Sequence, residues 1–220
     1  ILVDNGNGDK QDAKFWSHYY LYGDDTLEKS LAKYGFSSDD ITDVILTHLH
    51  FDHCGGSIKV ERDKLVPAFK NANYWSNLLH WDWAVNPNER EKASFLPENI
   101  LPIEASGQLK FTEVTAMENG QLGETSFSES ISIRFVNGHT KAMMLPQIKL
   151  NDKTVVFMAD LLPSAGHIPL PYIMGYDMFP LTTLQEKKVF LKEALENNYI
   201  LFFEHDPVHE CCTLQKTERG

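Results

Sequence analysis

The stretch Thr47-His48-Leu49-His50-Phe51-Asp52-His53 decides the fold of this chain, because it places three histidines and one aspartate within six consecutive positions. The preceding run, Ile41 to Thr47, is largely apolar and β-branched, so it is predicted to form a buried strand that ends where the histidines begin. Side chains at alternate positions of an extended chain share a face, so His48 and His50 can converge on one cation, with Asp52 on the same face.

His53 extends this cluster to a second cation. A turn from Phe51 into Gly55-Gly56 brings His53 beside Asp52, and these two side chains can bind a cation of their own. Imidazole suits zinc, iron, nickel and copper alike, and a carboxylate adds hard-ligand character, so zinc is only the first choice. The competing interpretation is a hydrophilic or pH-sensitive loop, which the density of the motif disfavours.

Further ligands are expected where other strands end. The predicted strand Ile131 to Val136 leads into Asn137-Gly138-His139-Thr140, and a glycine there allows a tight turn. The apolar run Thr154 to Ala159 ends at Asp160, and the run Tyr199 to Phe203 leads to His205. His139 would complete the first site, His205 the second, and the two oxygens of Asp160 could bridge both cations.

The order H-x-H-x-D-H, G-H-T, a strand-ending aspartate and a late strand-ending histidine resembles the metallo-β-lactamase superfamily of hydrolases. The resemblance covers nearly the whole chain and includes the opening Ile1 to Gly6, which is similar to the family's I-L-x-D-x-G strand, whose aspartate supports the metal loops. It implies a mixed α/β fold, an αββα sandwich, with two metals. The implied ligands are His48, His50 and His139 on one metal, Asp52, His53 and His205 on the other, and Asp160 between them.

The chemistry expected from this site is hydrolysis by a metal-bridging hydroxide. Two divalent ions about 3.5 to 4 Å apart can hold and ionise a water near neutral pH, and they polarise the substrate carbonyl or phosphoryl oxygen. Zinc is the preferred metal, with iron, manganese, cobalt or nickel as alternatives. Asp52 can pass a proton to the leaving group. Asp160 is the second residue expected to take part in catalysis, as the bridge between the two metals. Cys54 is predicted to be a small buried residue rather than a catalytic thiol.

Residues within the motifs separate the branches of the superfamily. Flavin-linked di-iron members carry glutamate where this chain has His50, and true β-lactamases usually lack an aspartate at the position of Asp160. The formal net charge of -11 disfavours binding of nucleic acid. The segment Ala159 to Tyr172 resembles the loop of a lactonase-like branch that includes quorum-quenching N-acyl-homoserine lactone lactonases and organophosphate hydrolases.

Substrate contacts are expected from this loop and from an aromatic segment. Smaller lactonases have a tyrosine where this chain has Pro163, so His167 or Tyr172 would have to substitute for it. Among the aromatic residues, Phe15 or Trp16 and one of Trp81 or Trp83 are expected to reach the cleft. We therefore expect a lactonase, most simply for an N-acyl-homoserine lactone. A phosphotriesterase or arylesterase of the same fold is the alternative, and a non-catalytic metal-binding scaffold is the alternative from another class.

Composition is that of a globular enzyme. The 220 residues are 42% hydrophobic, which suffices for one domain over residues 1–220, and no stretch is long enough to span a membrane. An odd number of cysteines favours a reducing, cytoplasmic compartment. Ile1 begins within a strand pattern, so we expect upstream strands in a longer chain, and an exported form stays open. The expected partner is a small-molecule substrate, without nucleic acid or membrane, and a homodimer is allowed.

The remaining elements are predicted from local signals. A helix is expected from Asp25-Thr26-Leu27-Glu28 to Gly35, where a cap begins it and a glycine ends it. A second, amphipathic helix is expected from Thr182 to Asn197, with Leu184, Val189, Phe190, Ala194 and Leu195 inward. Residues 71–118 have no clean period and are expected to form short helices as a lid or dimer contact.

Overall fold

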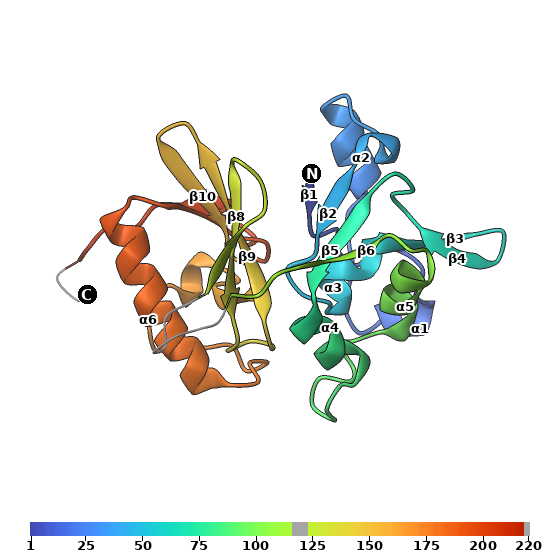
Figure 1. The fold of residues 1–220 in the computed structure, drawn as a ribbon. Helices are drawn as coiled ribbons and strands as arrows, with labels where there is room; N and C mark the ends of the chain where they lie inside the picture. Colours follow the sequence, from blue (N-terminus) through green and yellow to red (C-terminus); the bar gives the residue numbers. More distant parts are fainter. Residues whose placement is uncertain (116–122, 218–220) are drawn as a thin grey trace. The chain divides into compact units, whose positions relative to one another are not determined.

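The computed structural model describes residues 1–115 and 123–217, and the chain divides into two compact units (Figure 1). Unit 1 comprises Ile1–Ser76 and Trp81–Phe111, and unit 2 comprises Asn77–His80 and Thr112–Gly220. The expectation of one domain over residues 1–220 is not tested by this division and stays a prediction.

Unit 1 is built on a four-stranded sheet in the order β1-β2-β5-β6. Its strands are β1 (Leu2–Val3), β2 (Asp43–Ile45), β5 (Asn73–Asn77) and β6 (Leu109–Thr112). The first three are parallel, with Leu2 paired to Val44 and Val44 to Tyr74. The carboxyl ends of β1 and β2 therefore meet at one edge of the sheet, where Asp4 and the histidine motif follow. A separate hairpin joins β3 (Ile58–Glu61) to β4 (Lys64–Pro67).

The helices of unit 1 are short. They are α1 (Ala13–Trp16), α2 (Leu27–Lys33), α3 (Phe51–Cys54), α4 (Leu78–Val85), whose first turn belongs to unit 2, and α5 (Pro97–Ala105). The predicted helix at Asp25 to Gly35 is confirmed as α2. The hydroxyl of Thr26 caps it by accepting a hydrogen bond from Lys29 N at 3.2 Å, and Gly35 follows with a φ of 80°.

The prediction for residues 71–118 was wrong in part, because this segment supplies two strands of the sheet, β5 and β6, besides α4 and α5. Polar residues interrupt the apolar pattern of β5, yet Tyr74, Ser76 and Asn77 are all fully buried. Tyr74 is held by its hydroxyl, which donates to Ser57 O at 3.1 Å and accepts from Phe69 N at 3.0 Å. Internal hydrogen bonds of this kind let a strand bury polar atoms, which a hydropathy pattern does not predict. Residues 116–118 lie outside the described residues.

Unit 2 contains a six-stranded sheet in the order β12-β11-β10-β9-β8-β7. In chain order its strands are β7 (Glu124–Ser126), β8 (Ile131–Val136), β9 (Met143–Leu150), β10 (Lys153–Phe157), β11 (Ile200–Phe202) and β12 (Cys211–Cys212). The strand predicted at Ile131 to Val136 is confirmed as β8, and β10 and β11 lie at the other two predicted positions. Antiparallel pairs join β8 to β9 and β9 to β10, whereas β10 and β11 are parallel.

Helix α6 (Pro180–Glu196) lies along one face of this sheet (Figure 1, orange). Phe190 and Ala194 are buried as predicted, in a core with Val136, Met143 and Leu201. The helix begins at Pro180, two residues before the predicted start, because proline at the first helical position needs no backbone donor and has its φ preset. The predicted inward residues Leu184, Val189 and Leu195 are only half-buried.

Two charged residues of α6 are buried, although an amphipathic helix was predicted to expose its charged residues. Glu186 and Lys187 are 4% and 0% exposed. An amphipathic pattern assigns charged residues to solvent, so it did not predict them as buried. Their partners, described below, belong to the loops that carry the candidate ligands of unit 2.

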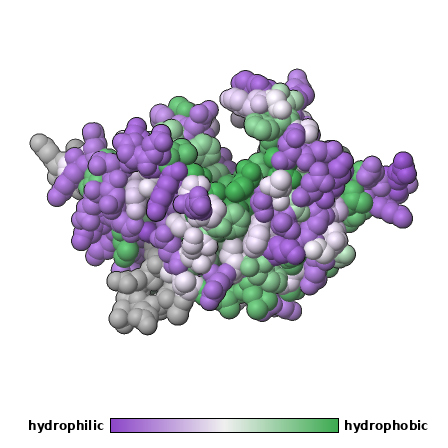
Figure 2. All heavy atoms as spheres, turned by 45° about the horizontal axis from the view of Figure 1, so that its top comes forward, coloured by the Kyte–Doolittle hydropathy of each residue, from purple (hydrophilic) through white to green (hydrophobic). Residues whose placement is uncertain are grey.

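The face of the molecule shown in Figure 2 is predominantly hydrophilic. This agrees with 31 acidic and 20 basic residues in the sequence. Among the described residues, no helix is long and apolar enough to cross a membrane.

Candidate metal centre

The histidine motif of unit 1 follows β2 and runs into α3. His48 and His53 are fully buried and His50 is 7% exposed, whereas the side chain of Asp52 is 33% exposed. The ring centroid of His48 lies 4.5 Å from that of His50 and 3.9 Å from that of His53. The structure therefore brings the four predicted ligands of unit 1 together. The extended alternation predicted through Asp52 was wrong beyond His50, because helix α3 begins at Phe51.

Asp4 supports this motif from the end of β1. One carboxylate oxygen, Oδ1, accepts from Thr47 N at 2.7 Å, and the other, Oδ2, accepts from Thr47 Oγ1 at 2.7 Å and lies 2.9 Å from His53 Nδ1. Asp4 is 3% exposed and has a φ of 50°, a conformation that aspartate tolerates better than most residues. Its carboxylate fixes the ring of His53 with Nε2 left to face a ligand. The supporting role that the family resemblance implied for this aspartate agrees with these contacts.

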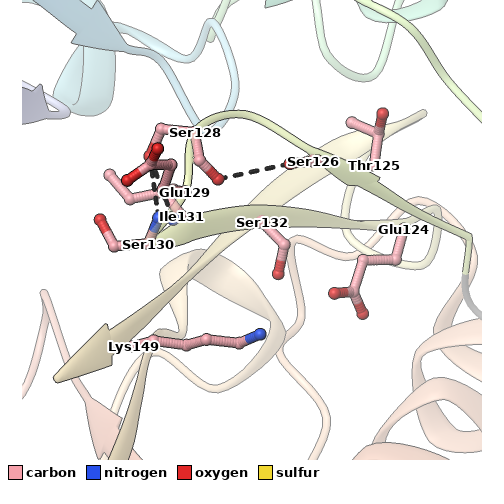
Figure 3. A pocket seen from close by; sticks show the side chains of 9 residues that line it. All are labelled: Glu124, Thr125, Ser126, Ser128, Glu129, Ser130, Ile131, Ser132 and Lys149. Atoms are coloured by element: carbon pink, nitrogen blue, oxygen red, sulfur yellow. Dashed lines mark hydrogen bonds between the residues drawn. The ribbon is translucent and has the colours of Figure 1, made fainter. Parts of the chain in front are cut away.

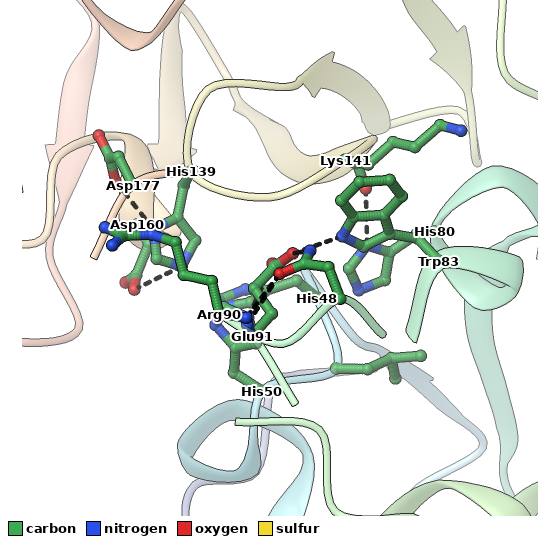
Figure 4. A network of polar contacts seen from close by, with 12 residues as sticks. His48, His50, His80, Trp83, Arg90, Glu91, His139, Lys141, Asp160 and Asp177 are labelled. Carbon is green, nitrogen blue, oxygen red and sulfur yellow. Dashed lines mark hydrogen bonds and ion pairs between the residues drawn. The ribbon is translucent and has the colours of Figure 1, made fainter. Parts of the chain in front are cut away.

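A second carboxylate, Glu91, lies beside His50 (Figure 4). Its Oε1 is 3.4 Å from His50 Nε2, and both side chains are buried. Its Oε2 accepts from Trp83 Nε1 at 2.6 Å and from Asn88 Nδ2 at 2.9 Å. The sequence analysis did not identify Glu91, because an isolated acidic residue in a segment rich in tryptophan and asparagine carries no motif.

The candidate ligands of unit 2 are His139, Asp160 and His205, which follow β8, β10 and β11 respectively. Asp160 Oδ2 lies 3.2 Å from His139 Nε2, and Asp160 Oδ1 lies 3.2 Å from His205 Nε2. Behind His139, Asp177 Oδ1 lies 3.0 Å from Nδ1 (Figure 4). Each oxygen of Asp160 thus faces a different imidazole, and Asp177 fixes His139 with Nε2 toward Asp160.

Helix α6 holds the turn that carries His139. The carboxylate of Glu186 accepts from Asn137 N at 2.7 Å and from Gly138 N at 2.9 Å. Burial raises the pKa of Glu186 to about 7, although these two hydrogen bonds oppose the shift. A Cβ on Gly138 would overlap the backbone and hydroxyl of Thr183, so this glycine is required by the close approach of the helix.

The donor chemistry in each unit fits divalent metals such as zinc. Imidazole nitrogens and carboxylate oxygens are the usual ligands of zinc. A carboxylate commonly accepts a hydrogen bond from the other ring nitrogen of a histidine that binds zinc. Unit 1 offers His48, His50, Asp52 and His53, and unit 2 offers His139, Asp160 and His205. The combination of both sets around two metals stays a prediction at this point.

Cys54 is structural, as predicted. It is fully buried, its Sγ donates to Leu49 O at 3.3 Å, and burial raises the pKa of its thiol to about 12. A thiol that stays protonated is neither a nucleophile nor a soft metal ligand.

The aromatic segment of α1 packs beside the metal motif. Phe15 lies edge-on to Phe51 with ring centroids 5.2 Å apart, and Tyr19 lies 4.9 Å from Phe51. Phe15 and Trp16 are both half-buried and are in contact, with centroids 4.9 Å apart. Trp81, by contrast, is 5% exposed in the core of unit 1. Substrate contact by Phe15 and Trp16 is not tested by these positions.

The loop after Asp160 is held at three points. Ala165 N donates to Asp206 Oδ2 at 2.9 Å, and Ser164 Oγ lies 2.9 Å from His167 Nδ1. Lys187 Nζ donates to the carbonyls of Pro169, Leu170 and Tyr172 at 3.1, 3.4 and 2.7 Å. Burial lowers the pKa of Lys187 to about 8, and Asp177 opposes the shift. The roles of Lys187, Glu186 and Asp177 could not be predicted from the sequence, because each acts through contacts distant in sequence.

Two predicted substrate residues lie in this loop. His167 is half-buried, and burial together with Lys187 lowers its pKa. Tyr172 is 61% exposed. Pro163 is buried, and its carbonyl accepts from His205 N at 3.2 Å. The position that is a tyrosine in smaller lactonases therefore supports a ligand-bearing loop here.

A polar hollow at the β7–β8 turn is unrelated to these residues (Figure 3). Its lining includes Glu124, Ser132 and Lys149. It includes the first residues of β8, whereas His139 follows the last residue of that strand.

Comparison with known proteins identifies the family. The family model described as the metallo-beta-lactamase superfamily matches residues 1–205. The chain therefore belongs to this superfamily. Family and fold define it as a metal-dependent hydrolase, which is the enzyme class expected from the sequence. No curated protein matches the sequence significantly.

Solved structures share the fold over almost the whole chain. A probable metal-dependent hydrolase from Staphylococcus aureus is 22% identical, with a TM-score of 0.85 over 96% of this chain and 72% of its own. AidC, described as a dizinc quorum-quenching lactonase, is 24% identical, with a TM-score of 0.75 over 99% of this chain and 72% of its own. AbOPH, a hydrolase of the beta lactamase superfamily, is 18% identical, with a TM-score of 0.72 over 98% of this chain and 71% of its own. The predicted metallo-β-lactamase fold is confirmed.

Proposed function

We propose that this metal-dependent hydrolase opens a lactone ring, such as that of an N-acyl-homoserine lactone, with the help of two divalent metals. The ligands in this proposal are those expected from the sequence: His48, His50 and His139 on one metal, Asp52, His53 and His205 on the other, and Asp160 between them. Zinc is the preferred metal.

The observation that carries the proposal is the arrangement around Asp160. Its two oxygens face His139 Nε2 and His205 Nε2 separately, each at 3.2 Å. A carboxylate between two imidazoles, with one oxygen toward each, is suited to bridge two cations. The family resemblance assigns these two histidines to different metals, and the contacts of Asp160 support that assignment.

The residues of this chain would divide the chemical work. When bound, two metals would polarise the scissile carbonyl and supply an ionised water at neutral pH. Asp52 is the most exposed candidate ligand of unit 1, with a side chain 33% exposed, so it can exchange a proton with the leaving oxygen. Asp4 and Asp177 would keep the rings of His53 and His139 oriented throughout the reaction.

The loop from Leu161 to Tyr176 supports lactones as the substrate class. Its sequence resembles that of the lactonase-like branch, and AidC, a quorum-quenching lactonase by its description, matches 99% of the chain. His167 lies half-buried in this loop, and Tyr172 exposes 61% of its surface, so both can contact a small substrate. We propose these two residues, with Phe15 and Trp16, as substrate contacts.

A phosphotriester or aryl ester is the second candidate substrate. The observation that favours it is Pro163, which places no hydroxyl where smaller lactonases use a tyrosine on the substrate carbonyl. Phosphoryl and carbonyl centres can be served by the same pair of metals, so this position bears on the choice between them.

A substrate screen tests the proposal. The zinc-loaded protein would be assayed with acyl-homoserine lactones of varied chain length, an aryl ester and a paraoxon-like triester, before and after chelation. We expect lactone turnover that chelation abolishes and zinc restores. Faster triester turnover would favour the second candidate, and zinc-loaded protein without activity on any of them would indicate a non-catalytic scaffold.

The variant Asp160→Asn tests the bridge separately. An amide offers only one good ligand oxygen, so we expect the zinc content to fall at both positions together with turnover. Unchanged zinc content, measured by elemental analysis, would contradict the bridging assignment.

A further inference from the structure

We propose that Glu91 is a positioning residue that fixes the ring of His50 and thereby selects Nδ1 of His50 as its metal-binding atom. The inference rests on the proposed function only in taking His50 as a metal ligand. Nothing in the sequence motif points to Glu91, which lies 41 residues after His50.

Two contacts of His50 and one contact of the next residue, Phe51, come from one short segment, Glu91 to Phe95. Glu91 Oε1 lies 3.4 Å from His50 Nε2, and the ring of Phe95 lies 4.7 Å from the imidazole, centroid to centroid. Ser94 O accepts from Phe51 N at 2.9 Å, which ties the residue after His50 to the same segment. Backbone hydrogen bonds from Ser94 N and Phe95 N to Glu91 O close this turn. His50 is thus contacted by a turn whose hydrogen bonds include Glu91 O.

The carboxylate of Glu91 is itself held in place. Its Oε2 accepts from two donors, Trp83 Nε1 at 2.6 Å and Asn88 Nδ2 at 2.9 Å. Neither the indole nor the amide nitrogen can accept a hydrogen bond in return, so this oxygen must act as an acceptor. The other oxygen, Oε1, is therefore directed at His50, in a position where both side chains are at most 9% exposed.

Three of the four other candidate histidines are supported on the opposite nitrogen, whereas His205 faces Asp160 Oδ1 through its Nε2 at 3.2 Å. Asp4 contacts Nδ1 of His53, Asp177 contacts Nδ1 of His139, and Thr47 Oγ1 lies 3.0 Å from Nδ1 of His48. Those three rings are oriented to present Nε2. Glu91 contacts Nε2 of His50, so a carboxylate that accepts its Nε2–H leaves the lone pair on Nδ1. Glu91 would therefore orient the ring of His50 so that it presents Nδ1 instead of Nε2.

The variant Glu91→Gln tests this selection sharply. Trp83 and Asn88 both require an acceptor, so the amide oxygen of the variant is expected to face them and its NH2 group to face His50. An amide donor at Nε2 favours the tautomer with its proton on Nδ1, which removes the lone pair that the metal needs. We expect the zinc affinity to fall by about 10- to 100-fold, the range for lost outer-shell partners.

Trp83→Phe is the matched control. It removes one hydrogen bond from Glu91 Oε2 and leaves the Oε1 contact with His50 in place, so we expect a zinc affinity close to that of the parent protein. An equal loss of zinc in Trp83→Phe and Glu91→Gln would overturn the proposal, because the effect would then come from the local fold. Zinc affinity would be measured by chelator competition.

The tautomer gives a readout that does not depend on variants or activity. In metal-free parent protein labelled with ¹⁵N-histidine, His50 is expected to carry its proton on Nε2, with its signals assigned from a His50→Gln spectrum. A proton on Nδ1 would overturn the proposal, as would unchanged tautomer and zinc affinity in Glu91→Gln. A parent protein that binds zinc but hydrolyses nothing would refute the proposed function alone, because these readouts test Glu91 independently.

Discussion

The two units build their candidate ligand sets in opposite ways. Unit 1 takes four ligands from one motif, His48 to His53, and supports them with carboxylates from β1 and from the Glu91 turn. Unit 2 takes one ligand from the end of each of three strands and supports them from α6 and the residues before it. A set contained in one motif depends on a few polar contacts, whereas a set spread over three strands depends on how a helix packs against a sheet. The predictions below test that difference.

The largest effect is expected from Gly138→Ala in unit 2. A methyl group there would overlap the backbone of Thr183, so α6 must move or the turn before His139 must open. We expect a loss of about 3 kcal/mol in the free energy of unfolding, measured with denaturant. Gly175→Ala is the control, because a Cβ there meets nothing within 4 Å. Equal stabilities of the two variants would contradict the dependence on helix packing.

The next effect is expected from Asp4→Asn in unit 1, compared with Asp177→Asn in unit 2. Asp4 contacts Thr47 N, Thr47 Oγ1 and His53 Nδ1, and Asp177 Oδ1 contacts Nδ1 of His139. We expect Asp4→Asn to cost about 2 to 3 kcal/mol in unfolding free energy and Asp177→Asn about 1 kcal/mol. The reverse order would show that unit 1 does not depend on its carboxylate more than unit 2 does.

A pH-dependent effect is expected from Lys187. Burial lowers its folded pKa to about 8 from an ordinary 10.5, so between these values the unfolded chain binds more protons, and stability gains from this group as pH rises. The stability of the parent protein relative to Lys187→Met should therefore rise from pH 8 to pH 10, by at most about 1.4 kcal/mol per pH unit. Melting curves of both proteins across this range test it. A difference that stays flat would show that burial does not lower the pKa of Lys187.

The smallest effect is expected at the substrate. If the loop of unit 2 binds substrate, His167→Ala should raise the KM for lactones several-fold with kcat and zinc content nearly unchanged. Phe15→Ala makes the corresponding change in unit 1. A larger KM effect from Phe15→Ala would assign substrate selection to the aromatic segment instead.

The same contrast explains how much could be predicted from sequence. The strand β8, the helix α2 and the clustering of the candidate ligands of unit 1 follow from short-range patterns, because alternation and capping act over a few residues. The ends of β8, β10 and β11 also indicated His139, Asp160 and His205. Glu91 and Lys187 could not be predicted, since their partners lie 41 and 15 to 18 residues away and a charged side chain is assigned to solvent by default. β5 was missed because its buried polar residues break the strand pattern.

Adjacent residues of α6 link two loops with different tasks. Glu186 holds the turn that carries a candidate metal ligand, and Lys187 holds the carbonyls of the loop proposed to contact substrate. A shift of this helix would therefore displace both loops at once. Substitution of side chains in the 161–176 loop could adapt the protein to a new substrate and leave the support by α6 untouched. A change in the backbone path of this loop would also disturb the position of His139. The fold thus favours evolution of specificity by exchange of side chains over remodelling of the loop.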